Sequence, residues 1–336
     1  GTTTNEIKEQ LELFLLKSNI QAEFYECEFG QYYEAIIFEE EGLYDFKPDF
    51  VYLHVSIENL KSLYDFEKTS EEKAEEEFIK FQSIWKKLNQ AFQCEVIQDN
   101  FELPQFKSLG NFDSSTSSSI SRTITLLNEM INNYSMKASF LYVCDRHYLS
   151  SRMGLALWKD YSLWLSAKYS LSYKAISNLC YSLSKIIESI LGFSKKCLVL
   201  DLDNTLWGGV IGDDGVDGIL LGRDSPIGEA YLDFHLYIKQ LKDRGVILAV
   251  CSKNEFENAK NAFKHPDSIL KFTDFTVFKA NWDIKTKNIY EIAQEINIGL
   301  ESMVFIDDNP VERDIVRKEF QGLVCVPEIG DDVTLY

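Results

Sequence analysis

The sequence of 336 residues lacks the features that mark membrane and secreted proteins. It contains no uninterrupted run of about 18 apolar residues, which a membrane-spanning helix would need. Its first residues, GTTTNEIKEQ, show no basic head followed by an apolar core, so no signal peptide is indicated. We therefore expect a cytoplasmic protein that has no membrane partner.

Basic residues are scarce, with 34 Lys and Arg against 53 Asp and Glu, and the formal net charge is −19. Such an excess of negative charge repels the phosphate backbone of nucleic acids and anionic membrane surfaces. The composition therefore argues against both as partners. A small phosphorylated substrate remains compatible with this composition, because the electrostatic field at a local site can be opposite in sign to that of the whole protein.

The seven cysteines are odd in number, scattered along the chain and never arranged as CxxC. This usage is typical of a reducing cytosol and excludes a disulfide framework or a zinc site. With 45% hydrophobic and 26% charged residues, the composition is that of a globular protein. The length favours two domains.

Helices and strands alternate along residues 1–192, which predicts a parallel α/β sheet with crossover helices. A Ser-rich loop over 111–121 leads into a helix that ends near Tyr134. The helix over 171–191 could belong to either domain or bridge both, and Gly192 can end it. The other expected helices cover 6–18 and about 70–92, and the expected strands cover 50–55, 94–98 and 139–144.

The alternation restarts after this boundary, so a second α/β domain is expected over 193–336. A Gly-rich flap over 207–222 and one helix occupy the stretch between Thr205 and Ser252, and no large cap domain fits there. The expected strands are 197–200, 246–251, 275–278 and 303–306, and the expected helices are 228–244, 255–263 and 285–296.

The segment LVLDLDNTLWGG (198–209) ends a buried apolar strand in two carboxylates, Asp201 and Asp203. In an open α/β sheet, ligands bind beyond the carboxyl ends of the strands. Two carboxylates at such an edge can share a hard cation, because Mg²⁺ prefers oxygen ligands. By itself this pattern is equally compatible with a polar, solvated turn.

Two further segments place phosphate-binding groups at a strand end or a helix start. Ser252 ends the apolar strand in LAVCSKN (248–254), where its hydroxyl and the amides that follow can bind a phosphate or simply cap a helix. Lys285, in ANWDIKTKN (280–288), stands near a helix start, where the helix dipole disfavours a positive charge. A transferring phosphoryl group would explain its position, although a surface lysine is the alternative and Lys287 competes for the role.

The fourth segment, MVFIDDNP (303–310), ends a strand in Asp307 and Asp308. Adjacent carboxylates repel each other unless a cation or a basic group compensates them. A polar turn closed by Pro310 is the alternative for this segment alone. The four segments together place an acidic pair, a hydroxyl, a lysine and a second acidic pair at one sheet edge.

This order of motifs resembles the haloacid-dehalogenase-like (HAD) superfamily over residues 196–330. Members of that superfamily mostly transfer phosphoryl groups through an aspartate. The resemblance implies a Rossmann-like parallel sheet without a large cap domain. It also implies that Asp201 is the nucleophile, that Asp203 is the general acid and base, that Thr205 holds this carboxylate and the loop, that Ser252 binds the phosphoryl group and that Lys285 balances its charge.

The same resemblance implies a Mg²⁺ site formed by Asp201, the backbone carbonyl of Asp203, Asp307 and Asp308. Asp308 would be the direct ligand, and Asp307 would act through water or as the partner of the lysine. Trp207 could line the entrance or anchor the flap, and Trp282 has the same two interpretations. The expected substrate-binding residues are Asn204, Trp207, Lys253, Asn254 and Asn309.

The resemblance narrows to the FkbH-like branch of the superfamily and extends over nearly the whole chain. The segments that carry it include ECEFGQY (26–32), YDFKPDFVYLHVS (44–56), DRHYLSSRMG (145–154), CLVLDLDNTLWGGVIGDDG (197–215), GRDSPIGEAYLDF (222–234) and VFIDDNPVER (304–313). The branch implies transfer of a glyceryl unit from 1,3-bisphosphoglycerate to the thiol of an acyl carrier protein, with release of phosphate. Cys251 is the natural acyl acceptor on this chain, and a packed strand residue is its alternative interpretation.

The N-terminal domain of that branch resembles an SGNH-type hydrolase with a flavodoxin-like α/β fold. Here no Gly-Asp-Ser element begins the chain, and Asp145-Arg146-His147 has DxH rather than DxxH spacing. An Asp–His pair could still serve a serine. We favour a scaffold or recognition domain without esterase activity.

Two classes of function follow from the sequence. The first is an enzyme that acts on a phosphorylated small molecule or on a phosphate held by a macromolecular carrier, since an uncapped site admits large substrates. The second is a module that binds a carrier protein or a metabolite and has an idle phosphatase site. The intact acidic pairs favour the enzyme.

Overall fold

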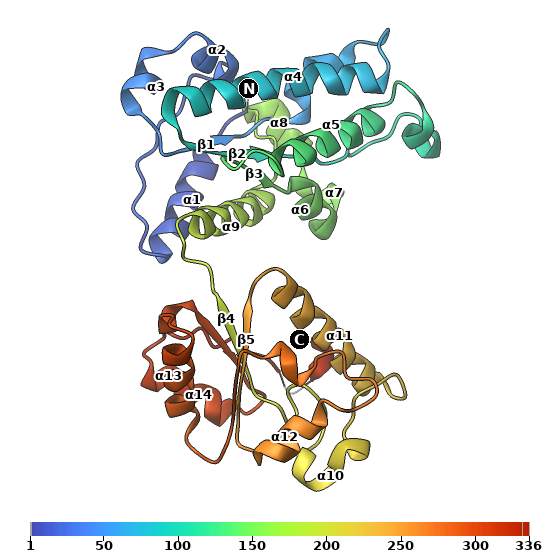
Figure 1. Cartoon of the computed structure of the whole chain (residues 1–336). Coiled ribbons are helices and arrows are strands. Elements are labelled where there is room, and N and C mark those ends of the chain that lie inside the picture. The colour runs from blue at the N-terminus through green and yellow to red at the C-terminus, as the bar shows by residue number, and fades with distance from the viewer. Residues whose placement is uncertain (1, 331, 336) are drawn as a thin grey trace. The chain divides into compact units, whose positions relative to one another are not determined.

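The computed structural model describes residues 2–330 and 332–335. The chain divides into two compact units, Gly1–Gly192 and Phe193–Tyr336, which are coloured from blue to green and from yellow to red in Figure 1. Each unit has a parallel sheet of its own. Among the described helices, none combines the length and the apolar character that crossing a membrane requires.

The N-terminal unit is built on three parallel strands in the order β1-β2-β3. They are β1 (Phe50–Leu53), β2 (Glu95–Asp99) and β3 (Leu141–Cys144). Helix α4 (Ser70–Phe92) connects the first two strands, and helix α5 (Ile120–Ser135) connects the second pair. The carboxyl ends of all three strands therefore meet at one edge of the sheet.

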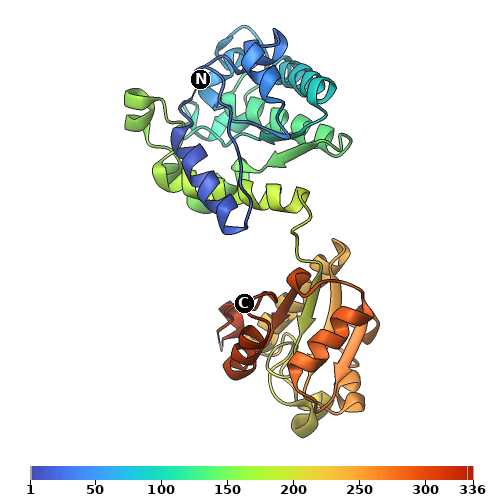
Figure 2. The same cartoon turned by 90° about the vertical axis from the view of Figure 1, so that its left-hand side faces the viewer.

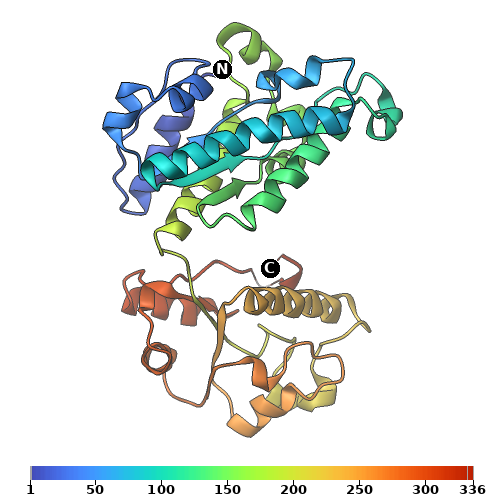
Figure 3. The ribbon, with the colours of Figure 1, turned by 45° about the horizontal axis from the view of Figure 1, so that its top comes forward.

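Helices cover both faces of this sheet. On one face α4 and α5 lie side by side, as Figure 3 shows, and bury Phe81, Trp85 and Ile124. On the other face α1 (Asn5–Lys17) packs against α9 (Tyr173–Ile190), which identifies α9 as part of this unit. A sheet that is buried on both faces needs the apolar strands that the sequence supplies.

Several short elements of the N-terminal unit are additional to the predicted ones. The short α-helices are α2 (Tyr32–Ile37), α3 (Glu41–Phe46), α6 (Arg146–Met153), α7 (Leu155–Trp158) and α8 (Tyr161–Ala167). Three 3₁₀ turns are η1 (Ile57–Asn59), η2 (Lys61–Tyr64) and η3 (Gly110–Ser115).

The C-terminal unit has four parallel strands in the order β6-β5-β4-β7. In this sheet Leu200 lies opposite both Val250 and Ile306, so the residues that follow three of the strands meet at one edge. The strands are β4 (Cys197–Leu200), β5 (Ile247–Ser252), β6 (Val277–Ala280) and β7 (Met303–Ile306).

Helices also cover both faces of the C-terminal sheet (Figures 1 and 2). One face packs against α10 (Ile211–Gly218), α11 (Pro226–Asp243) and α12 (Phe256–Ala262). The other packs against α13 (Lys285–Glu295) and α14 (Pro310–Glu319). The described part of this unit also contains the 3₁₀ turns η4 (Phe272–Asp274), η5 (Leu300–Ser302) and η6 (Val333–Leu335).

The flap after β4 is small. Gly208 and Leu220 form an antiparallel bridge across it, and α10 lies between them with a kink at Gly215, whose φ is 68°. The stretch between β5 and α13 holds only α12, η4 and β6. The predicted fold class, two α/β units with a parallel C-terminal sheet that carries no large cap, is confirmed.

Candidate active site

Strands β4 and β7 bring the two acidic pairs together. The backbone N–H of Asp201 donates to the carbonyl of Ile306 at 2.9 Å, which continues the strand register by one residue. Carboxylate oxygens of Asp201, Asp307 and Asp308 all lie within 4.8 Å of one another. The side chains of Asp201 and Asp307 are buried, and that of Asp308 is half-buried.

Lys285 compensates part of this negative charge from the first residue of α13. Its Nζ lies 2.9 Å from Oδ1 of Asp201 and 2.5 Å from Oδ2 of Asp307. Burial alone would lower the pKa of Lys285, but attraction to Asp201 and Asp307 outweighs burial and raises that pKa above its ordinary value. Lys287, the competing candidate, lies on the surface and pairs with Asp283 at 2.8 Å.

The acidic cluster fits a hard divalent cation. One lysine balances only one of three neighbouring carboxylates, and burial followed by the charge of Asp201 raises the pKa of both Asp307 and Asp308. Oδ1 of Asp201 is buried, and its partner is the ammonium group of Lys285, which Asp201 shares with Asp307. Carboxylate oxygens that carry uncompensated charge are the ligands that Mg²⁺ prefers.

Asp203 is held by three hydrogen bonds. Its Oδ1 accepts from Nε1 of Trp207 at 2.9 Å and from the backbone N–H of Ile211 at 3.0 Å. Its Oδ2 accepts from Nδ2 of Asn254 at 2.7 Å. Burial raises the pKa of Asp203 although these hydrogen bonds oppose the shift. A carboxyl group with a raised pKa is suited to general acid catalysis.

Thr205 holds a different carboxylate from the one expected. Its buried hydroxyl donates to Oδ1 of Asp308 at 3.3 Å and accepts from the backbone N–H of Asp308 at 3.2 Å. The sequence analysis expected Thr205 to hold Asp203, but Trp207, Ile211 and Asn254 hold that carboxylate instead. Thr205 therefore ties the loop after β4 to the loop after β7.

A pocket of about 210 Å³ brings the predicted groups together at this sheet edge. Ser252, at the end of β5, is 2% exposed and contributes to the pocket wall. The lining residues are Asp201, Asp203, Asn204, Ser252, Lys253, Lys285, Asp308, Asn309 and Glu312. The four predicted segments therefore converge on one site.

Three predicted substrate-binding residues line this pocket and are already tied to the protein. Lys253 pairs with Glu312 at 2.6 Å. The side chain of Asn309 accepts from the backbone N–H of Val311 at 2.9 Å and caps α14. Asn204 has a φ of 54°, and its side-chain oxygen accepts from the backbone N–H of Gly209 at 2.9 Å.

Trp207 and Asn254 hold Asp203 in place, and neither lines the pocket. Trp207 is only 1% exposed, and its ring packs edge-on against Phe263 with the ring centroids 5.5 Å apart. The expectation that it lines the entrance is therefore wrong, and its anchoring role is the one observed. Asn254 contacts Asp203 and is absent from the pocket lining. Trp282 is exposed and donates to Glu255.

Cys251 is packed inside the unit. Its side chain is fully buried, its Sγ lies 3.6 Å from the backbone carbonyl of Lys285, and burial raises the pKa of the thiol. A nucleophilic thiol must be accessible and ionised. The structure therefore contradicts Cys251 as an acyl acceptor and bears out the alternative, a packed strand residue.

Arg313 is a supporting residue that the sequence analysis missed. It lies one turn into α14, is 5% exposed and donates from Nη1 to the carbonyl oxygens of Asp307 and Asp308 at 2.7 and 2.6 Å. Its place in VFIDDNPVER, directly after the acidic pair, was the available signal.

The DxH segment of the N-terminal unit does not form an Asp–His pair. The Asp145 side chain accepts from the backbone N–H of Tyr148 at 3.0 Å and caps α6. The ring of His147 lies 3.3 Å from the carbonyl oxygen of Phe101. Asp145 therefore caps its own helix and accepts from Asn100, and His147 contacts the loop after β2.

The fold and the convergent acidic site define a HAD-like phosphatase domain. Over the N-terminal unit, residues 12–190 match the family model described as FkbH, N-terminal domain. The crystal structure of the N-terminal part of the protein BF1531 from Bacteroides fragilis, which contains a phosphatase domain and is complexed with Mg, is 33% identical. The match covers 99% of this chain and 88% of that chain, with a TM-score of 0.89. The chain belongs to the FkbH family.

Two other solved structures match a smaller part of the chain. A HAD family enzyme from Bacteroides thetaiotaomicron, complexed with magnesium and inorganic phosphate, is 12% identical over 39% of this chain and 92% of that chain, with a TM-score of 0.28. A phospho-aspartyl intermediate analogue of phosphoserine phosphatase is 17% identical. The match covers 40% of this chain and 92% of that chain, with a TM-score of 0.24. Among curated proteins no significant match exists.

Proposed function

We propose that the chain is a Mg²⁺-dependent phosphatase that works through an aspartyl-phosphate on Asp201. The observation that carries the proposal is the buried contact of Lys285 with both Asp201 and Asp307, beside the Asp308 carboxylate in one pocket. An anionic nucleophile approaches an anionic phosphate only where nearby positive charge cancels their repulsion. Lys285 supplies one such positive charge, and a cation held by the three carboxylates would supply the rest.

The residues of this chain divide the reaction into two steps. In the first, an oxygen of Asp201 attacks phosphorus, the bond to the leaving oxygen breaks, and Asp203 donates a proton to that oxygen. In the second, the Asp203 carboxylate accepts a proton from water while the water oxygen attacks phosphorus and frees Asp201. The raised pKa of Asp203 suits the first step. Ser252 and Lys285 hold the transferred group.

Mg²⁺ is the cofactor of the proposed reaction, and the bound cation supplies charge neutralisation at the phosphoryl oxygens. Asp201 and Asp308 would hold it together with the backbone carbonyl of Asp203. Asp307 is paired with Lys285 in the structure, which favours its role as the partner of the lysine over that of a direct ligand. The Mg-bound BF1531 structure supports this choice of metal.

For the substrate we propose 1,3-bisphosphoglycerate. The thiol of an acyl carrier protein attacks the acyl carbon and the 1-phosphate leaves, and Asp201 then removes the phosphoryl group of the 3-phosphate ester, so that a glyceryl unit stays on the carrier as a thioester. Membership of the FkbH family and the open, uncapped pocket support this choice. The burial of Cys251 argues that the acceptor is the thiol of the carrier itself.

Phosphate release from p-nitrophenyl phosphate and from acetyl phosphate, measured with Mg²⁺ and with EDTA, tests the activity. Asp201→Asn should abolish release in both assays. Asp243→Asn, the same change at an exposed residue at the end of α11, should retain it. Release that is unaffected by Asp201→Asn would refute the assignment. No Mg²⁺-dependent release from any phosphorylated metabolite would favour a binding module with an idle site.

A further inference from the structure

A second polar cluster lies at the carboxyl edge of the N-terminal sheet. His54 follows β1, Asp99 ends β2, and Ser170 comes from the loop before α9. His54 Nε2 lies 2.9 Å from Oγ of Ser170, and His54 Nδ1 lies 2.9 Å from Oδ2 of Asp99. A serine, an imidazole and a carboxylate are therefore joined in series, although none of the three is close to another in sequence.

The neighbours of Asp99 orient the imidazole. Asp99 is fully buried, and its Oδ2 also accepts from the hydroxyl of Tyr52 at 2.7 Å and from Nη1 of Arg146 at 3.1 Å. Burial raises the pKa of Tyr52 well above its ordinary value, so the phenol stays a neutral donor. With Asp99 accepting from Nδ1–H, the other ring nitrogen of His54 is the one that accepts the proton of Ser170.

The charged residues next to the Ser170–His54–Asp99 series form ion pairs with one another or with Asp99, and they do not use His54 or Ser170 as partners. Arg146 pairs with Glu102 at 2.5 Å as well as with Asp99, and Lys159 lies 3.1 Å from Glu102 and 2.8 Å from Glu58. These contacts account for the buried ions as a structural network. They give no reason for a serine hydroxyl on the far nitrogen of the imidazole.

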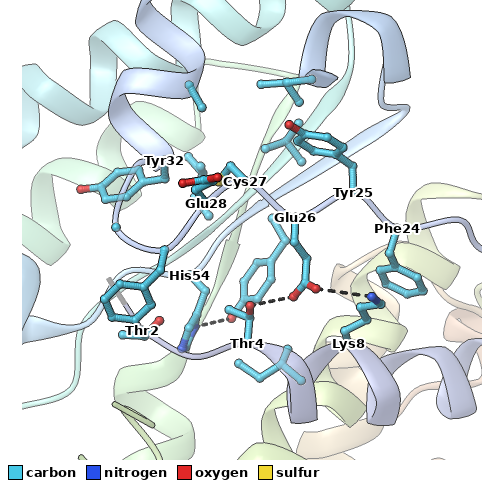
Figure 4. Close-up of a pocket in the computed structure, with 18 of the residues that line it drawn as sticks. Thr2, Thr4, Lys8, Phe24, Tyr25, Glu26, Cys27, Glu28, Tyr32 and His54 are labelled. Carbon is cyan, nitrogen blue, oxygen red and sulfur yellow. Dashed lines mark hydrogen bonds and ion pairs between the residues drawn. The ribbon is translucent and has the colours of Figure 1, made fainter. Parts of the chain in front are cut away.

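Ser170 is also accessible to a ligand, because it lines a pocket. This pocket, of about 340 Å³, is also lined by Ile57, Tyr64, Phe106, Lys159 and Trp164. The wall is mainly apolar and aromatic, and its charged members are Glu58, Lys159 and Asp160, with Lys159 paired to Glu58. His54 contributes to a different pocket, of about 230 Å³, in which Figure 4 shows it near Thr2 and Thr4 of the N-terminal segment. The imidazole therefore borders one pocket while its serine partner opens to the other.

We propose that Ser170, His54 and Asp99 form a catalytic triad that hydrolyses carboxylic esters with an apolar acyl group, which enters the pocket lined by Ser170. The geometry of the two hydrogen bonds and the apolar wall beside the hydroxyl carry this inference. It goes beyond the proposed phosphatase, and it replaces the expectation that the N-terminal unit is a scaffold or recognition domain without esterase activity.

The reaction balances without a cofactor. Oγ of Ser170 bonds to the ester carbonyl carbon while its proton passes to Nε2 of His54. The ester C–O bond then breaks, and the leaving alcohol takes that proton. Water next attacks the acyl-serine and gives a proton to Nε2. The bond from Oγ to the carbonyl carbon breaks, Ser170 recovers the proton, and a carboxylic acid leaves.

The test uses the full chain, a fluorophosphonate probe with mass-spectrometric mapping, and hydrolysis of p-nitrophenyl butyrate. We expect labelling at Ser170 and ester hydrolysis that Ser170→Ala lowers by about 100-fold or more. Ser166→Ala is the matched control, because Ser166 is an exposed serine of α8 whose hydroxyl donates to a backbone carbonyl. It should retain both signals.

A second variant and a folding check make the result decisive. His54→Gln should lower labelling and hydrolysis while Ser170 is still present. Thermal unfolding and phosphate release should show that Ser170→Ala is folded, since it loses only one oxygen. Absence of both labelling and hydrolysis in the folded wild-type chain would overturn the proposal. So would signals that are equal in the wild type and Ser170→Ala.

Discussion

Arg313 donates from one nitrogen to two consecutive backbone carbonyls, those of Asp307 and Asp308. A single side chain on α14 thus fixes the peptide groups that carry the second acidic pair. Arg313 also pairs with Glu328 at 3.3 Å, which leaves its side chain little freedom to move.

Arg313→Met should weaken metal binding by roughly 10–100-fold, the range found when groups that orient metal ligands are removed. Because Arg313 does not contact the nucleophile and does not itself line the phosphoryl pocket, kcat at saturating Mg²⁺ should change little. A Mg²⁺ titration of phosphate release measures both quantities. Lys318→Met, at an exposed position of the same helix, is the control. An unchanged Mg²⁺ requirement would contradict the role given to Arg313.

Lys285→Met should destabilise the metal-free protein by about 3–5 kcal/mol, because it leaves two buried carboxylates without their cation. Mg²⁺ should restore part of this loss, since it neutralises the same charges. Thermal unfolding with and without Mg²⁺ gives the comparison. Lys287→Met removes an exposed lysine two residues away and should leave stability nearly unchanged. Equal effects of the two variants would refute the argument.

Asp308→Asn should change stability in a pH-dependent way. The raised pKa of Asp308 means that the folded, metal-free protein binds this proton more tightly than the unfolded chain does. That contribution is present below the unfolded pKa of about 3.9 and is lost as pH rises through the higher folded pKa. In EDTA, the variant should therefore gain stability relative to wild type as pH rises from about 4 to 7.

Mg²⁺ should reverse this order at neutral pH, because Asp308→Asn removes a ligand. Unfolding temperatures across the pH series, with and without Mg²⁺, provide the readout. Asp314→Asn, on the exposed side of α14, controls for the loss of one negative charge. A stability difference that stays constant with pH would show that Asp308 has no raised pKa in the folded protein.

Trp207→Phe should lower kcat by about 10-fold, since it removes one of the donors that fix the general acid Asp203. The fold should persist, because the phenyl ring keeps most of the contact with Phe263. Steady-state kinetics on p-nitrophenyl phosphate test the prediction, with Trp282→Phe as the exposed control. A change in KM without a change in kcat would instead support the expectation that Trp207 lines the substrate entrance.

Cys251→Ala should retain phosphate release, and Cys251 should resist alkylation in the folded protein. The reason is its complete burial, whereas Cys325 is exposed. Iodoacetamide labelling followed by peptide mass spectrometry compares the two thiols directly. Rapid labelling of Cys251 under native conditions, or an acyl adduct on it during turnover, would contradict the buried assignment.

The elements that the sequence predicted well are those with a strong apolar pattern. Helix α4 covers Ser70–Phe92 as expected, because Phe81, Trp85 and Leu88 form one buried stripe and Thr69 caps the start. Strands β4 and β7 also lie where predicted. Helices α6 and α14 were missed because their buried positions include arginines, Arg146 and Arg313, whose partners come from distant segments.

The convergence of the site was predictable from one rule, that parallel strands end at a common edge. Which side chains face the pocket was not. Cys251 lies on a strand that is buried on both faces, so alternation gave no guide to its direction. Trp207 turns inward because Asp203 offers its indole an acceptor, and the Ser170–His54–Asp99 series joins residues that only the tertiary fold brings together.

The claim that Asp201 is the nucleophile can be tested by trapping the phosphorylated enzyme. The protein is incubated with ³²P-labelled acetyl phosphate and Mg²⁺, quenched in acid, reduced with borohydride and mapped by peptide mass spectrometry. We expect Mg²⁺-dependent ³²P label before reduction, release of that label as phosphate on reduction with formation of homoserine at position 201, and neither label nor homoserine in Asp201→Asn. Homoserine at another position, or steady turnover without any acid-stable phosphoenzyme, would contradict this assignment.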